Sequence, residues 1–151
     1  MPIQRPTTIR HRTSLFEDAV AIVNGEFASE LSLDDIARRV ASSRRQLQRA
    51  YAEIGETTFR EHLTGVRMER AADLLTTRSL TVREVAYRVG YRQPAQFAKA
   101  FRRHHGASPS DFRAANTGTR IPHEARSADD LIERSAVLDH GRFGRSHVVA
   151  A

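Results

Sequence analysis

The 151-residue sequence contains no cysteine, a single lysine and no long run of apolar residues. Without cysteine, the chain cannot form disulfides, use a thiol nucleophile or hold zinc through thiolates. The N-terminal stretch MPIQRPTTIRHRTS lacks the apolar segment of a signal peptide, and no later run is as long as a membrane span. We therefore expect a soluble intracellular protein of the cytoplasm.

Acidic residues are outnumbered by basic ones. The chain has 24 Lys and Arg against 18 Asp and Glu, a formal net charge of +6 and a pI near 10.8. This balance favours an anionic partner, such as nucleic acid or a membrane surface. All but one of the basic residues are Arg, which binds phosphate and guanine through two nitrogens at once. A genomic base composition that favours Arg codons is an alternative explanation.

The middle of the chain contains an internal repeat. The stretch LSLDDIARRVASSRRQLQRAY, from Leu31, resembles LTVREVAYRVGYRQPAQFAKAF, from Leu80, and five apolar positions recur 49 residues later. Each copy predicts a short helix, a tight turn and a second helix. Ser32 and Thr81 are the expected N-caps, and Gly90 is expected in the second turn.

Further helices are needed because neither copy can bury much apolar surface alone. The stretch SLFEDAVAIVNGEF predicts a helix before the first copy, and residues 58–76 predict a long helix between the copies. SPSDFRAA predicts a short closing helix capped by Ser108. No strand-like alternation occurs, so the fold is expected to be all-α. Residues 1–12 are expected to be flexible, and residues 116–151 to be a variable tail with at most one helix, in SADDLIERSAVL.

Each copy lacks acidic residues over its turn and second helix. Between Asp35 and Glu53, and again from Val85 to Pro109, every Asp, Glu, Lys or Arg present is basic. The acids stand at the start of the first helix of each copy, where they favour the helix dipole. A helix in the major groove lies between two phosphate walls, which repel carboxylates and attract Arg. A solvated basic face would explain one such run, but the same pattern in both copies predicts DNA binding.

Three stretches carry a resemblance to a known family. They are LDDIARRVASSRRQLQRAY, the pattern R-x-x-x-A-x-x-L-L at Arg67–Leu75, and VREVAYRVGYRQPAQFAKAFRRHHGASPSDFR. The last contains A-x-x-x-G-[FY] at Ala86–Tyr91, F-x-x-x-F-[RK]-[RK] at Phe97–Arg103 and G-x-[ST]-P-x-x-[FY]-R at Gly106–Arg113. Over residues 13–115 the chain resembles the DNA-binding unit of the AraC/XylS family of bacterial transcription regulators. The resemblance implies seven helices, with helix-turn-helix units at about 31–55 and 80–106 joined by a long linker helix.

The same resemblance implies a sequence-specific regulator that binds double-stranded promoter DNA in the nucleoid, has RNA polymerase as a further partner and is not an enzyme. The chain has no room for a separate effector domain, so it resembles the stand-alone members typified by MarA and SoxS. Such members bind DNA as monomers, and we expect one chain to contact two adjacent major-groove segments. No small-molecule effector is expected, so activity should follow protein abundance or a partner. Two alternatives remain, an architectural DNA binder with little sequence preference and a module that binds RNA polymerase or another regulator.

The expected DNA contacts lie opposite the expected core residues Leu47, Tyr51, Phe97 and Phe101. From family positions and outward faces, the expected base contacts are Arg45, Gln48, Arg49, Gln96 and Lys99. The expected contacts to the DNA backbone are Ser43, Arg44, Arg92, Arg102 and Arg103. For any single Arg, phosphate contact or plain solvation remains an alternative to base contact. Pro94 and Ala95 depart from the family pattern and offer no side-chain hydrogen bond to a base.

Nothing in the sequence predicts a catalytic site, a cofactor or a metal site. No nucleophile motif and no Gly-rich phosphate loop occurs. His104 and His105 are adjacent, and because neighbours on a helix are expected to point in different directions, the pair is not expected to hold one metal ion.

Overall fold

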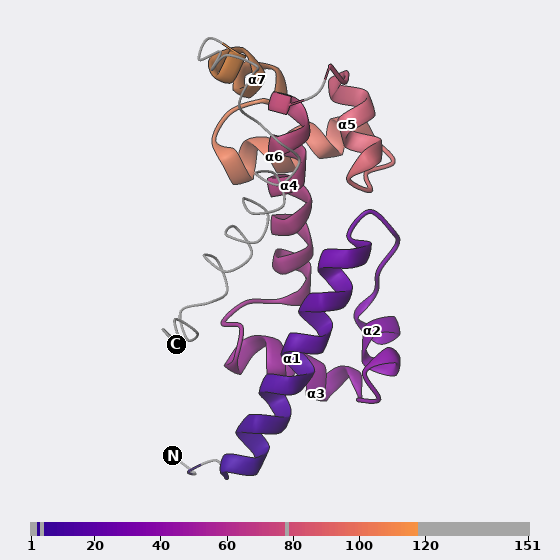
Figure 1. Ribbon diagram of the computed structural model, residues 1–151, viewed down its shortest axis with the longest axis vertical. Coiled ribbons are helices and arrows are strands. Elements are labelled where there is room, and N and C mark those ends of the chain that lie inside the picture. The colour runs from indigo at the N-terminus through magenta and orange to yellow at the C-terminus, as the bar shows by residue number, and fades with distance from the viewer. Residues whose placement is uncertain (1–2, 4, 78, 118–151) are drawn as a thin grey trace. The chain divides into compact units, whose positions relative to one another are not determined.

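The computed structural model describes residues 3, 5–77 and 79–117, and these form helices joined by short turns (Figure 1). The helices are α1 Pro6–Glu26, α2 Leu33–Arg39, α3 Arg44–Glu53, α4 Phe59–Thr77, α5 Val82–Arg88, α6 Pro94–His105 and α7 Pro109–Thr117. No strand occurs among the described residues. The all-α, seven-helix fold expected from the sequence is confirmed. None of these helices is long and apolar enough to cross a membrane.

A first group of helices consists of α1, α2 and α3, which pack against one another, with α1 also contacting α4. The ring of Tyr51 on α3 meets that of Phe16 on α1 edge to face, with 5.2 Å between centroids. The buried apolar residues of this group are Leu15, Phe16, Ala19, Val23, Ile36, Ala37, Leu47, Ala50 and Tyr51. They recur at helical spacing, so each helix presents one apolar side to this core.

A second group consists of α5 and α6, which pack against each other and against α4. Its hydrophobic core contains Met68, Ala71, Leu75, Val85, Ala86, Val89, Phe97 and Phe101. The first three lie on α4, so one long helix takes part in both groups, as Figure 1 shows. Arg113 on α7 donates hydrogen bonds from Nε to Leu75 O, at 3.1 Å, and from a terminal nitrogen to Leu80 O. These bonds tie Arg113 of α7 to this second group.

Capping residues begin most of the short helices, as the sequence predicts. The hydroxyls of Ser32, Thr81 and Ser108 accept hydrogen bonds from the backbone N–H three residues later. At Thr81 the bond is reciprocal, because the Glu84 carboxylate accepts from Thr81 N at 2.8 Å. Such a capping box satisfies two donors that the first turn of a helix leaves open.

The expectation that residues 1–12 form a flexible segment is partly wrong. Residues 6–12, expected to belong to a flexible segment, are the first turns of α1. Pro6 stands at the first helical position, where its fixed φ suits the helix. Arg12 also forms an ion pair with Glu53 at the end of α3, which attaches this part of α1 to its neighbour.

The C-terminal expectations fall largely beyond the described residues. Helix α7 includes residues 116 and 117, which were assigned to the tail. The helix expected in SADDLIERSAVL, residues 127–138, lies outside the described residues.

Candidate nucleic-acid interface

The two helix-turn-helix units, α2–α3 and α5–α6, repeat the same turn geometry. The residue after the C-cap has a positive φ in both, 53° in the first unit and 95° in the second. Equivalent hydrogen bonds close the two turns, from Ser42 N to Ala37 O at 2.8 Å and from Tyr91 N to Ala86 O at 2.9 Å. Donors and acceptors alike are 49 residues apart, so the sequence repeat is also a repeat of backbone structure.

Helix α3 buries one side and exposes the other. Leu47 is fully buried and Tyr51 is 1% exposed, as predicted. Ser43 caps the helix, and its hydroxyl accepts a hydrogen bond from Gln46 N at 3.2 Å. The exposed residues include all the predicted contacts on this helix, Arg44, Arg45, Gln48 and Arg49.

Helix α6 has the same division. Phe97 and Phe101 are fully buried, as predicted. Gln93 is the N-cap but makes no side-chain capping bond, and Pro94 is the first helical residue. The exposed residues include the predicted contacts Gln96, Lys99, Arg102 and Arg103, and Arg92 is exposed just before the helix.

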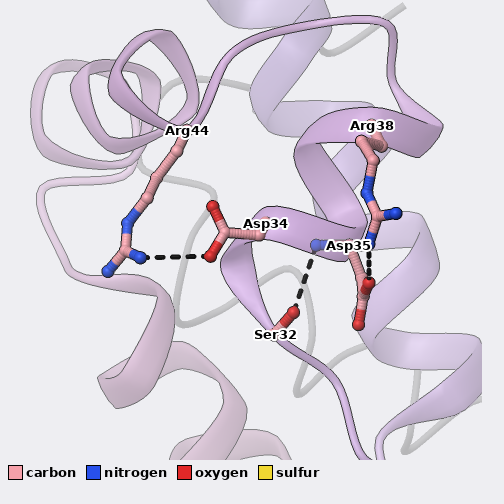
Figure 2. Close-up of polar contacts among 5 residues, drawn as sticks. All are labelled: Ser32, Asp34, Asp35, Arg38 and Arg44. Carbon is pink, nitrogen blue, oxygen red and sulfur yellow. Dashed lines mark hydrogen bonds and ion pairs between the residues drawn. The ribbon is translucent and has the colours of Figure 1, made fainter.

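The first turn of α2 carries two carboxylates that neutralise nearby arginines, as Figure 2 shows. Asp34 accepts a hydrogen bond from Arg44 at 3.1 Å, and Asp35 pairs with Arg38 on its own helix. Ser32 caps this turn through Asp35 N. Asp34 therefore stands at the edge of the basic face of α3, bound directly to one predicted phosphate contact.

Two further ion pairs join basic residues of the units to acids outside them. Arg39 pairs with Glu26 at the end of α1, and its guanidinium, by hydrogen bonding, holds the pKa of Glu26 below the usual range. Arg92 pairs with Glu30 in the segment between α1 and α2. Sequence spacing did not reveal the partners of Arg44 and Arg92, because each pair joins residues from different elements.

The remaining predicted contacts have side chains without a partner inside the described part of the chain. Across residues 3, 5–77 and 79–117, they form no hydrogen bond or ion pair. They are Arg45, Gln48, Arg49, Gln96, Lys99, Arg102 and Arg103. Because these side chains are exposed and have no partner among the described residues, their donors can bind an external acceptor without first breaking a contact within that part of the chain.

The expectation that His104 and His105 point apart is wrong. One nitrogen of each, together with a carboxylate oxygen of Glu69, lies within 4.8 Å of the others. His104 Nε2 is 3.0 Å from Glu69 Oε1, and His105 Nε2 is 3.1 Å from Met68 O. Both rings turn back toward α4, because the end of α6 packs on that helix. The pair thus connects α6 to α4.

These features define a class of protein, an α-helical DNA-binding domain with two helix-turn-helix units. A family model described as a helix-turn-helix domain matches residues 36–115, more than half of the chain. The structure is also similar to the DNA-binding domain of AdpA, solved in complex with a target DNA. The TM-score is 0.66 at 30% identity, and the match covers 70% of this chain and 95% of that one.

Two curated relatives extend the comparison. The chain is 31% identical over 107 residues to the HTH-type transcriptional activator AarP of Providencia stuartii, covering 71% of this chain and 79% of that protein. It is 33% identical over 92 residues to the Msm operon regulatory protein of Streptococcus mutans, covering 61% of this chain and 33% of that relative. The chain belongs to the AraC/XylS family of helix-turn-helix transcription regulators, which are DNA-binding proteins and not enzymes. It spans about a third of the length of the Msm regulator.

Proposed function

We propose that the chain regulates transcription as a monomer in the cytoplasmic nucleoid, with α3 and α6 in two adjacent major-groove segments of promoter DNA. The observation that carries this proposal is the pair of exposed basic helix faces, each held by the same turn in its unit and without an acid from the turn up to the last residue of α3 or α6. A groove-bound helix is flanked by phosphates on both sides, so its outward face must be free of carboxylates. Helix α6 contains no acid, and the single acid of α3, Glu53, is its last residue and pairs with Arg12 of α1.

Within this arrangement we assign base contacts mainly to the first unit. Arg45 and Arg49 can each donate two hydrogen bonds to guanine, and Gln48 can pair with adenine. In the second unit Gln96 and Lys99 are the base contacts, but Pro94 and Ala95 occupy the first turn of α6 without offering a donor. Contacts to the DNA backbone are assigned to Ser43, Arg44, Arg92, Arg102 and Arg103.

The internal ion pairs of Arg44 and Arg92 do not prevent these two residues from binding DNA phosphates. The Arg44 and Asp34 side chains are each 59% exposed, and those of Arg92 and Glu30 are more exposed still. Exposed pairs of this kind contribute about 0–1 kcal/mol. Exchanging the carboxylate for a phosphate as the partner of Arg44 or Arg92 therefore costs little.

The test is to select bound sequences from a random duplex library and to compare the selected site with random DNA over a salt series. We expect the selected site to bind at least about a thousandfold more tightly than random duplex. Affinity should also fall steeply with salt, because each phosphate contact releases counterions. Equal affinity for all duplexes would instead indicate an architectural protein, and a shallow salt slope a module whose main partner is a protein.

RNA polymerase is a further proposed partner, because a promoter-bound regulator acts on transcription through the enzyme that transcribes. Transcription in vitro from a template with the selected site should change when the chain is added to purified polymerase. A template with the site scrambled is the matched control. An unchanged transcript level on both templates would argue against this partner.

A further inference from the structure

The segment between α1 and α2, residues 27–32, leads into the first helix-turn-helix unit but is anchored on the second. Phe27 packs against the hydrophobic core that contains Phe97 and Phe101. The guanidinium carbon of Arg70, on α4, lies 5.6 Å from the centre of the Phe27 ring. Phe27 is thus held against α4 and the core that α4 shares with the second unit.

Arg67, on α4, binds this segment and the second turn at the same time. Its Nε donates to Phe27 O at 2.7 Å, and one terminal nitrogen donates to Ser29 O at 2.9 Å. Its guanidinium carbon lies 5.7 Å from the centre of the Tyr91 ring, in the turn between α5 and α6. One planar group thus satisfies two backbone carbonyls of the segment that leads into the first unit and stacks on an aromatic ring of the second.

The second turn is shaped to admit this contact. A Cβ on Gly90 would lie 2.9 Å from Ala28 O and 3.1 Å from the guanidinium carbon of Arg67. Gly90 also has a φ of 95°, which disfavours any side chain. The equivalent turn of the first unit has Ala41, with a φ of 53°. Glycine at position 90 is therefore required both by its backbone angle and by the close approach of the segment.

The surroundings of Arg67 are partly dry. Burial lowers the pKa of Arg67 and raises that of Tyr91, whose ring it faces. Arg stays charged under such burial, whereas a half-buried charge without hydrogen-bond partners would be strongly disfavoured. The two carbonyl contacts are therefore needed where Arg67 lies, and moving the segment away would leave the guanidinium unsatisfied.

From this geometry we infer that Arg67 is a positioning residue, which fixes the orientation of the first helix-turn-helix unit relative to the second. The segment it holds ends at Ser32, the N-cap of α2, and α2 packs directly on α3. Given the proposed function, a fixed orientation of α3 and α6 sets the spacing that the two DNA segments must have. Inserting one base pair between them shifts and rotates one segment by about 3.4 Å and 34°.

The orientation itself can be measured without DNA. Because the chain has no cysteine, Ala52→Cys on α3 and Ala95→Cys on α6 give two unique sites for spin labels, both exposed. We expect one narrow distance distribution between the labels and a clearly broader one when Arg67→Lys is added. A lysine keeps the charge but cannot bind two carbonyls and stack on Tyr91 together. Arg60→Lys, at an exposed position of α4, is the matched control and should leave the distribution narrow.

The consequence for DNA is tested with the selected site and with versions carrying one base pair more or fewer at its centre. The unsubstituted protein should lose about tenfold or more in affinity on the altered sites, and Arg67→Lys should lose much less. Circular dichroism establishes that the variants are folded. Gly90→Ala, whose Cβ would crowd Ala28 O and the Arg67 guanidinium, is a second substitution that disturbs the same contact.

The outcomes separate this inference from the proposed function. A broad distribution in the unsubstituted protein, or a narrow one that Arg67→Lys leaves unchanged, would overturn the positioning role. A distribution that broadens as expected, together with no spacing penalty on DNA, would leave the role of Arg67 intact. It would contradict binding to two adjacent segments.

Discussion

At the scale of single residues, the buried pair Tyr51 and His62 links stability to pH. The Tyr51 hydroxyl and His62 Nδ1 share a hydrogen bond of 2.9 Å, and His62 is only 1% exposed. Burial lowers the pKa of His62 to about 4 and raises that of Tyr51. The neutral imidazole is therefore the form that the folded core accepts.

We expect this pair to make the protein less stable in mild acid. The unfolded chain binds a proton at His62 below a pH of about 6.5, whereas the folded chain does so only near pH 4. The contribution of neutral His62 to the free energy of unfolding is thus fully present above about pH 6.5. It falls as the pH drops toward 4, by up to about 3 kcal/mol. Denaturant titrations across this range would measure the fall. His62→Gln, which does not titrate, should flatten it, and an unchanged pH dependence would show that other groups are responsible.

The arginines of the two units are expected to differ in what they contribute to DNA binding. Arg45→Ala or Arg49→Ala should cost about 1–3 kcal/mol on the selected site and relax the base preference at one position. Arg102→Ala or Arg103→Ala should weaken selected and random DNA alike and reduce the salt slope by about one. All four variants remove one positive charge, so a difference in sequence preference cannot come from net charge. The measurement is the affinity of each variant protein for a panel of duplexes with single-base changes. If Arg45→Ala and Arg49→Ala lose the same affinity on every duplex, the first unit is not the main source of specificity.

At the scale of elements, Ser43 combines a structural role with a predicted role in DNA binding. Its side-chain oxygen accepts the capping bond from Gln46 N, which leaves its O–H free to donate to a phosphate. Ser43→Ala should lower stability by about 1 kcal/mol through loss of the cap. Ser43→Asp keeps a good cap but places a carboxylate where a phosphate is expected.

The two substitutions therefore separate the roles of Ser43. Ser43→Asp should be as stable as the unsubstituted protein in thermal melts, yet bind DNA much more weakly in gel-shift titrations. If Ser43→Asp binds DNA normally, Ser43 lies away from the phosphates and serves only as a cap.

Most elements could be predicted from sequence because their signals are local. Ser32, Thr81 and Ser108 cap helices as predicted, and the buried residues of α3 and α6 follow from helical spacing. The start of α1 was missed, because Arg5 provides no side-chain cap and the pairing of Arg12 with Glu53 joins positions 41 residues apart. Local patterns do not report contacts of that kind.

At the scale of the whole molecule, the repeat predicts two units but not how they are held. The exposed faces of α3 and α6 were predictable, since the repeat carries the same buried positions into both, with Leu47 and Tyr51 matching Phe97 and Phe101 at a spacing of 50. The contact of residues 27–32 with Arg67 and Gly90 was not, although Arg67 begins a recognised motif. The motif marks the residue, but only the folded chain shows which carbonyls it binds.

Two unlike helices on one chain predict a DNA site without two-fold symmetry. Helix α4 has 19 residues and so a length of about 28 Å, close to the ~34 Å of one DNA turn. We therefore expect one chain to protect about two turns of DNA from cleavage, in an asymmetric pattern, with a mass in solution of one protein per duplex.

Lys99, the only lysine, gives a second measurement, which reports on α6. Its acylation by an amine reagent should be slowed by the complete site but not by a duplex cut back to the segment bound by α3. A symmetric footprint made by two chains, or equal Lys99 labelling with and without the complete site, would contradict simultaneous binding by both units.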